Sequence, residues 1–126
     1  MNDVYVEEIL DHFRNPRNYG EMKDADIVTK DVNTLCGDGF EFQIKTDGDL
    51  IKEVKFRGEG CAISTASASI LSEFMKGKSR KEISEMKNEK MVSLLGIPIS
   101  NARMKCALLP LEIAKAGLNG GKVEKC

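Results

Sequence analysis

Three cysteines and one aspartate are the residues of this sequence best suited to chemistry at a shared site. They are Cys36 and Asp38 in the stretch CGDGF, Cys61 in RGEGCAIS and Cys106 in RMKCALL. Thiolates bind zinc and iron, and a carboxylate is a harder and more labile ligand than a fourth sulfur. The four residues together suit a site that binds a metal or cluster and later releases it.

Each of these residues also has a simpler interpretation. An isolated cysteine often packs as a small buried hydrophobic residue, and an aspartate between two glycines, as at Asp38, is typical of a turn. The cysteines are 25 and 45 residues apart, which matches no zinc-ribbon or ferredoxin pattern. The residues alone therefore leave a metal site and ordinary structural roles both open.

The composition favours one small globular domain. The chain has 126 residues, 41% hydrophobic and 31% charged, with a formal net charge of −1. This balance offers no basic surface to nucleic acid, and no apolar run approaches the roughly 20 residues that cross a bilayer. The N-terminus does not resemble a signal peptide. We expect a single cytoplasmic domain over residues 1–126, with reduced thiols and no nucleic-acid or membrane partner.

Hydrophobic periodicity predicts a helix, then a sheet, then a block of helices. Apolar residues recur at helical spacing over 3–14 and alternate with polar residues over 40–45 and 54–56. Asp47-Gly48 indicates a hairpin between the last two segments, and residues 26–33 are a candidate third strand. The expected fold class is α+β, a three-stranded antiparallel sheet packed with surrounding helices.

The second half of the chain is expected to be helical. The predicted helices cover 62–76, a short segment from Arg80 capped by Ser79, 88–95, and a last segment from Asn101 or Lys105 to Ala116. The first of them is expected to place Ile63, Ala66, Ile70 and Phe74 on one face. Pro110 is expected to kink the last helix unless it lies in the first turn. Residues 118–126 are expected to form a flexible tail.

The cysteines fall at predicted ends of regular elements. Cys61 is expected at the start of a helix and Cys106 at or near the start of the last helix, where unpaired N–H groups and the helix dipole stabilise a thiolate. Gly58 and Gly60 are expected to let the backbone approach a bound group closely. Lys105 places a cation beside Cys106. His12 is interpreted as a helix-face residue without a role.

The chain resembles the IscU/SufU/NifU-N-terminal family of iron–sulfur cluster assembly scaffolds. The resemblance extends over essentially the whole chain and rests on YVEEILDHFRNPRNYG, LCGDGF, FRGEGCAISTASASILSEFMKGKS and ARMKCALLPLEIAKAGL. It implies a SufE/IscU-like scaffold fold in which Cys36, Asp38, Cys61 and Cys106 gather at one exposed end. It also implies that a [2Fe-2S] cluster is assembled from iron and persulfide sulfur supplied by a cysteine desulfurase, then passed to recipient apoproteins. In the family, zinc often occupies the site when no cluster is bound.

Two departures from the IscU pattern refine this expectation. The residue before the third cysteine is usually His in IscU proteins and is Lys105 here, and the chaperone-recruiting LPPVK segment is replaced by IPISNARMK. Both features are similar to the SufU branch, although the insertion that SufU proteins carry between the second and third cysteines is absent. Histidine ligation at position 105 is therefore excluded, and dependence on the dedicated chaperone is not expected.

The resemblance makes a scaffold, not an enzyme, the leading hypothesis. Cys36, Cys61 and Cys106 are expected to bind iron, with Asp38 as the exchangeable fourth ligand. Cys106 is the expected persulfide acceptor, and the auxiliary Lys105 is expected to offset the negative charge of the cluster.

Other interpretations stay open at this point. In a SufU-like zinc-dependent sulfurtransferase the same four residues would hold zinc, and in a third reading the zinc is purely structural. Tyr5 resembles a family tyrosine linked to self-association, which suggests a homodimer around the cluster, although a plain packing role is equally compatible. Cys126 is interpreted as a spare surface thiol.

Overall fold

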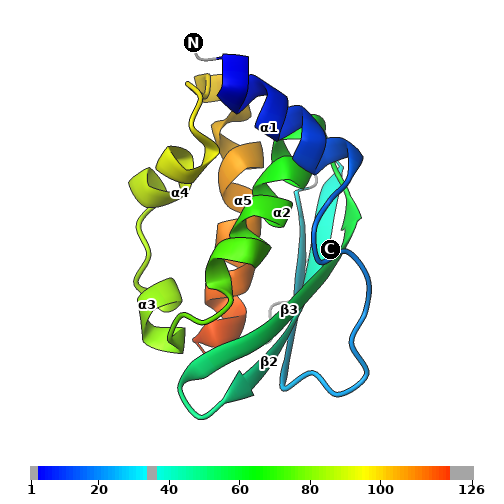
Figure 1. The fold of residues 1–126 in the computed structure, drawn as a ribbon, viewed down its shortest axis with the longest axis vertical. Coiled ribbons are helices and arrows are strands. Elements are labelled where there is room, and N and C mark those ends of the chain that lie inside the picture. Colours follow the sequence, from blue (N-terminus) through cyan, green and yellow to red (C-terminus); the bar gives the residue numbers. More distant parts are fainter. Residues whose placement is uncertain (1–2, 34–36, 120–126) are drawn as a thin grey trace.

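The computed structural model describes residues 3–33 and 37–119 and shows an α+β arrangement (Figure 1). The strands β1 (Ile27–Asn33), β2 (Asp38–Asp47) and β3 (Leu50–Glu59) form one antiparallel sheet in chain order. Helix α1 (Asp3–Arg14) precedes the sheet, and the helices that follow it are α2 (Ala62–Met75), α3 (Arg80–Ser84), α4 (Asn88–Leu95) and α5 (Asn101–Leu118). This arrangement confirms the predicted fold class. Among the described residues, no helix is both long enough and apolar enough to cross a membrane.

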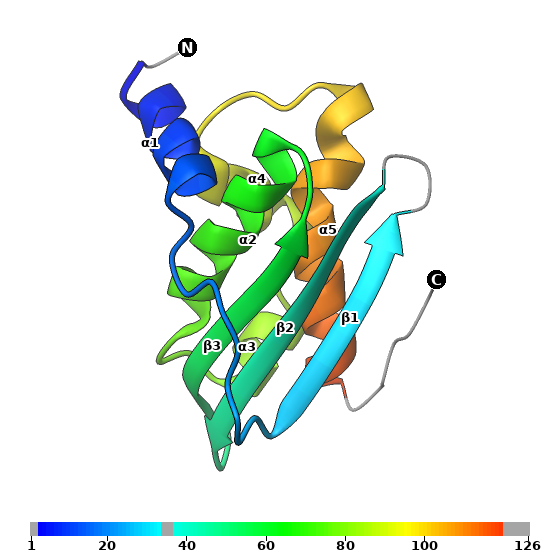
Figure 2. The ribbon, with the colours of Figure 1, turned by 90° about the vertical axis from the view of Figure 1, so that its right-hand side faces the viewer.

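The sheet has one face covered by helices, while the segment linking α1 to β1 crosses the other (Figure 2). The covered face carries the aromatic core, where the fully buried rings of Phe42 and Phe56 stack with centroids 5.7 Å apart. Helix α5 packs closely on β1. The Thr29 hydroxyl of β1 donates a hydrogen bond to the Ile113 carbonyl of α5 at 3.0 Å. A Cβ at Gly117 would lie 2.7 Å from the Thr29 methyl carbon. Burial of these apolar groups supplies the main driving force for the fold.

Most predicted boundaries are confirmed within a residue or two. The β2–β3 hairpin turns at Gly48, whose φ of 62° favours glycine, and Ser79 caps α3 by accepting a hydrogen bond from the Glu82 N–H at 3.0 Å. Helix α5 starts at Asn101, the earlier of the two expected starts, and continues through Pro110 in its interior. It ends at the buried Leu118, so the expected tail begins later than predicted. Residues 120–126 of that tail lie outside the described residues.

Helix α2 is buried on nearly all sides, because α1, α5 and the sheet all pack against it. Of the residues predicted to share one face, Ala66 is fully buried, and Ile63, Ile70 and Phe74 are partly buried and pack against the core. The fully buried positions of α2 include the large side chains of Leu71 and Met75 and four serines: Ser64, Ser67, Ser69 and Ser72. The hydroxyls of these serines therefore need hydrogen-bond partners inside the protein.

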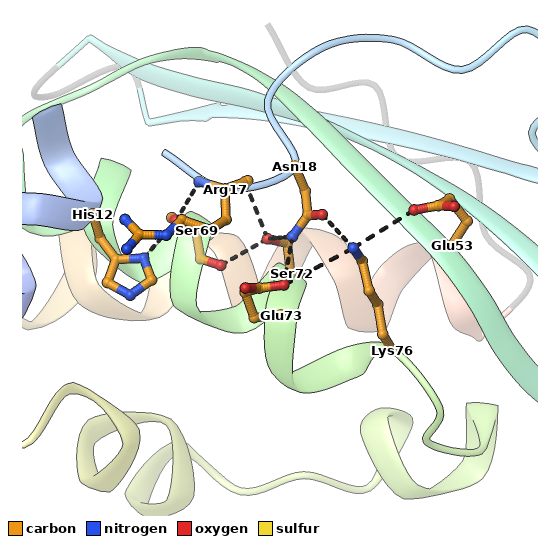
Figure 3. Close-up of polar contacts among 8 residues, drawn as sticks. All are labelled: His12, Arg17, Asn18, Glu53, Ser69, Ser72, Glu73 and Lys76. Carbon is orange, nitrogen blue, oxygen red and sulfur yellow. Dashed lines mark hydrogen bonds and ion pairs between the residues drawn. The ribbon is translucent and has the colours of Figure 1, made fainter. Parts of the chain in front are cut away.

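The connector, residues 15–20, is fastened to α2 on one side and to β3 on the other. The Arg17 N–H donates to Ser69 Oγ at 2.8 Å, at the centre of the polar contacts shown in Figure 3. On the opposite side, the Asn18 carbonyl accepts a hydrogen bond from the Phe56 N–H at 3.0 Å. The connector thus joins the central helix to the edge of the sheet.

We expect stability to rise with pH across the titration range of His12, to which the sequence assigned no role. Its Nδ1 lies 2.6 Å from Ser69 Oγ (Figure 3), and burial, followed by the charge of Arg17, lowers its pKa. The unfolded chain therefore binds a proton where the folded protein does not, and the free energy of unfolding falls as pH drops below about 6.5. Denaturant unfolding at several pH values should show this slope, smaller than that of one full proton. His12→Gln should flatten it, and an unchanged slope in that variant would contradict the assignment.

Candidate functional site

The structure brings three of the four predicted ligands together. A carboxylate oxygen of Asp38 and the sulfur atoms of Cys61 and Cys106 lie within 4.8 Å of one another. These residues come from the start of β2, the position just before α2, and the second turn of α5. Cys36 lies outside the described residues, two positions before Asp38, so its place in the site stays a prediction.

The pairing of β2 with β3 places Asp38 beside Cys61. Gly39 pairs with Glu59, so Asp38, one residue before Gly39, faces the chain that follows Glu59 into α2. The strands approach closely here because Gly58 has no side chain. A Cβ at Gly58 would lie 2.1 Å from the Gly39 carbonyl oxygen, and its φ of 140° also favours glycine.

Gly60 also lies where the surrounding atoms leave no room for a side chain. A Cβ there would lie 2.3 Å from Ser64 Oγ and 2.8 Å from the Phe40 ring. Protein atoms therefore occupy the positions where side chains at Gly58 and Gly60 would lie. The expected close approach of this backbone to a bound group stays a prediction.

Asp38 has one satisfied and one unsatisfied carboxylate oxygen. The side chain is only 4% exposed, and Oδ1 accepts a hydrogen bond from the Cys61 N–H at 3.2 Å. Oδ2 is buried and has no hydrogen-bond partner in the part of the chain that the structure describes. An unpaired buried oxygen of this kind is costly. A metal ion held with the neighbouring sulfur atoms would satisfy it.

Cys61 occupies the N-cap position of α2, as the sequence predicts. Its sulfur accepts a hydrogen bond from the Ser64 N–H at 3.4 Å. Burial raises the pKa of the Cys61 thiol, but hydrogen bonds with the Ser64 side chain, the Ser64 N–H and Cys106 outweigh burial and hold the pKa below its ordinary value, despite the negative Asp38 nearby. The thiolate of Cys61 therefore forms more readily than that of an ordinary cysteine.

Cys106 lies near the start of α5 but not at it. Because α5 begins at Asn101, Cys106 is its sixth residue and lies beyond the free N–H groups of the first turn. Its side chain is 6% exposed. Next to it, the Ser67 hydroxyl donates to the Ala107 carbonyl at 2.6 Å and holds α5 against α2. Packing between these helices, not a helix terminus, therefore places the Cys106 sulfur.

Lys105 is exposed and lies beside a shallow hollow at the end of β1. Asp31 and Val32 of β1 line this hollow with Lys105, Leu109 and Glu112 of α5. The structure thus places Lys105 on the outer surface next to Cys106.

Two residues near the site escaped the sequence interpretation. The Tyr19 hydroxyl donates to the Gly58 carbonyl at 3.0 Å and lies 3.2 Å from the Gly58 nitrogen, so it holds the end of β3. No local pattern predicts this contact across 39 residues. Ser64 contacts the Cys61 sulfur, and its position three residues after an N-cap was an available signal. The Tyr5 side chain and Cys126 lie outside the described part of the structure.

The arrangement provides a mixed sulfur and oxygen ligand set. Two sulfur atoms and one carboxylate oxygen are three of the four ligands that tetrahedral zinc or iron requires. The three ligands belong to elements that also pack against one another through apolar contacts and hydrogen bonds, such as the one between Ser67 and the Ala107 carbonyl.

Known proteins are similar to this chain in sequence and in fold. The family described as NifU-like N terminal domain matches residues 4–123. The zinc-dependent sulfurtransferase SufU of Bacillus subtilis is 35% identical, over 94% of this chain and 91% of the relative. The iron–sulfur cluster assembly scaffold protein IscU of Haemophilus influenzae is 34% identical, over 97% of this chain and 98% of the relative.

A solved structure agrees with these relatives. The SufU protein of Fervidobacterium islandicum superposes with a TM-score of 0.75 at 28% identity, over 89% of this chain and 94% of that protein. The family match and the relatives each span nearly the full chain and include the segments that carry Asp38, Cys61 and Cys106. This chain belongs to the NifU-like N-terminal domain family, together with the IscU and SufU proteins.

Proposed function

We propose that this protein is a scaffold on which a [2Fe-2S] cluster is assembled and from which it is passed to apoproteins. The observation that carries the proposal is the buried, unpaired Oδ2 of Asp38 next to the sulfur atoms of Cys61 and Cys106. Support also comes from the family, which includes the IscU scaffold proteins. The cluster is the cargo of such a protein, so a weak ligand in the set is an advantage.

The proposed ligands have different roles, because thiolates and a carboxylate bind iron differently. Cys36, Cys61 and Cys106 bind iron as thiolates, and Asp38 supplies the exchangeable fourth ligand. Because Asp38 Oδ1 is already held by the Cys61 N–H, its Oδ2 is free to bind or leave the iron without moving the backbone. Release of the cluster would then start at the carboxylate.

Sulfur enters as persulfide from a cysteine desulfurase, and Cys106 is the proposed acceptor. Its sulfur lies beside the other ligands, so sulfur bound there is delivered where iron is held. Two persulfide sulfur atoms need four electrons to become sulfide. Oxidation of two ferrous ions supplies two of these electrons, and an external reductant must supply the other two. The exposed Lys105 would offset the negative charge of the cluster.

A zinc-dependent sulfurtransferase is the second candidate, and the likeness to the SufU protein of Bacillus subtilis favours it. The same ligands would hold zinc, and one cysteine would leave the metal to accept sulfur. Anaerobic purification followed by iron, sulfide and zinc analysis and visible absorption separates the candidates. Cluster absorption with matching iron and sulfide supports the scaffold. One colourless zinc per chain, with no cluster formed when desulfurase, iron and reductant are added, contradicts it.

Asp38→Ala is expected to lengthen the lifetime of the bound cluster. The substitution removes the most labile ligand, so exchange at that position slows once another ligand or solvent molecule replaces it. The measurement is the decay of visible absorption after a chelator is added to the reconstituted protein. Faster decay than in the wild type would show that the carboxylate holds the cluster and does not help to release it.

Asp38→Asn is expected to stabilise the metal-free protein by about 1 kcal/mol, since it replaces an incompletely paired buried carboxylate with a neutral group. The same variant should bind zinc more weakly than the wild type. Both effects are measurable by urea unfolding in the presence of a chelator and by zinc titration. Asp47→Asn, at the exposed far end of β2, is the matched control and should change neither. A clear loss of metal-free stability in Asp38→Asn would mean that Oδ2 is paired in solution.

A further inference from the structure

Ser64 contacts the Cys61 sulfur through two different groups. Its N–H donates to Cys61 Sγ at 3.4 Å, and its hydroxyl oxygen lies 3.5 Å from the same sulfur. The hydroxyl also lies 3.2 Å from the Cys61 carbonyl oxygen. Ser64 is fully buried. One side chain outside the ligand set is thus held against a ligand atom.

The surroundings of Ser64 keep its hydroxyl in this position. Gly60 faces it so closely that a Cβ there would lie 2.3 Å from Ser64 Oγ. Other buried serines of α2 are directed elsewhere, because the Ser67 hydroxyl donates to the Ala107 carbonyl and the Ser72 hydroxyl donates to the Ser69 carbonyl. Among these buried serines, Ser64 is the one that contacts a predicted ligand.

The Ser64 hydroxyl has two acceptors within reach but only one proton. A metal-bound Cys61 carries no proton, so its sulfur can only accept a hydrogen bond. The hydroxyl can turn from the Cys61 carbonyl to the sulfur without leaving that carbonyl unpaired, because the Thr65 N–H also donates to it at 3.0 Å. The local geometry therefore allows a second hydrogen bond to the sulfur when metal binds.

We propose that Ser64 is a positioning residue that orients the Cys61 sulfur toward Asp38 and Cys106 and donates a hydrogen bond to it in the metal-bound state. The inference rests on the proposed role of Cys61 as a ligand, and it holds for a bound cluster or for zinc. Partners that hold a ligand from outside the ligand set typically change metal affinity by 10–100-fold, that is by roughly one to two orders of magnitude. Hydrogen bonds to ligand sulfur also raise cluster reduction potentials.

The test compares Ser64→Ala with Ser72→Ala in the full chain. Both variants remove one buried hydroxyl from α2 and favour the helix, so both should fold and lose a similar amount of thermal stability. In chelator competition, Ser64→Ala should bind Zn²⁺ about tenfold more weakly than the wild type, near the lower limit because the Ser64 N–H remains. Ser72→Ala should match the wild type, because the Ser72 hydroxyl donates to the Ser69 carbonyl and contacts no proposed ligand.

The second readout is the spectrum of the protein loaded with Co²⁺. Loss of the hydroxyl hydrogen bond should shift the sulfur-to-cobalt charge-transfer band in Ser64→Ala, and the band should stay unshifted in Ser72→Ala. Equal Zn²⁺ affinity and an unshifted band in Ser64→Ala would overturn the inference while the proposed function stands. Equal losses in both variants would also overturn it, by showing a general effect of α2. If the wild type binds neither Zn²⁺ nor Co²⁺ through Cys61, the proposed function and the inference both fail.

Discussion

The packing of α2 between the sheet, α1 and α5 is the contact on which the rest of the structure depends. Because this helix has almost no exposed face, its polar groups must be paired inside the protein. The buried serines of α2 meet this requirement, since hydroxyls such as those of Ser67 and Ser69 form hydrogen bonds with neighbouring segments. Ser69 holds the connector, and Ser67 holds α5. The same packing fixes the start of α2, where Cys61 lies.

The site forms where the start of β2, the start of α2 and the second turn of α5 come together. The β2–β3 pairing carries Asp38 to the start of α2, and the contact between α2 and α5 brings Cys106 to the same place. These contacts are strong, so the protein tolerates an unpaired oxygen on Asp38. A locally unfavourable group of this kind is commonly associated with function, because the surrounding structure must offset its cost. Here the unpaired oxygen belongs to Asp38, the ligand that is proposed to exchange.

Local signals were sufficient for most of the secondary structure. A hydrophobic period of two residues, or of nearly four, can be recognised within a short stretch of sequence. The elements α1, β2 and β3 and the Ser79 cap of α3 therefore follow from neighbouring residues. The periodicity of α2 predicts a shared face for Ile63, Ala66, Ile70 and Phe74, but it does not predict that the other sides of the helix are buried too. The serines of α2 read as polar positions, and only the packing of its neighbours shows that they are internal.

By itself, the sequence determined the types of ligand, their order along the chain, the fold class and the helix cap at Cys61, all of which depend on local chemistry or pattern. Only the tertiary structure decided that Asp38, Cys61 and Cys106 meet, since the last two are separated by 45 residues of chain. It also decided that Cys106 lies in the second turn of α5, because Asn101 and Lys105 are equally acceptable helix starts locally. The role of Ser64 belongs to the same class, since a hydroxyl becomes a partner of a ligand only when packing holds it against the sulfur.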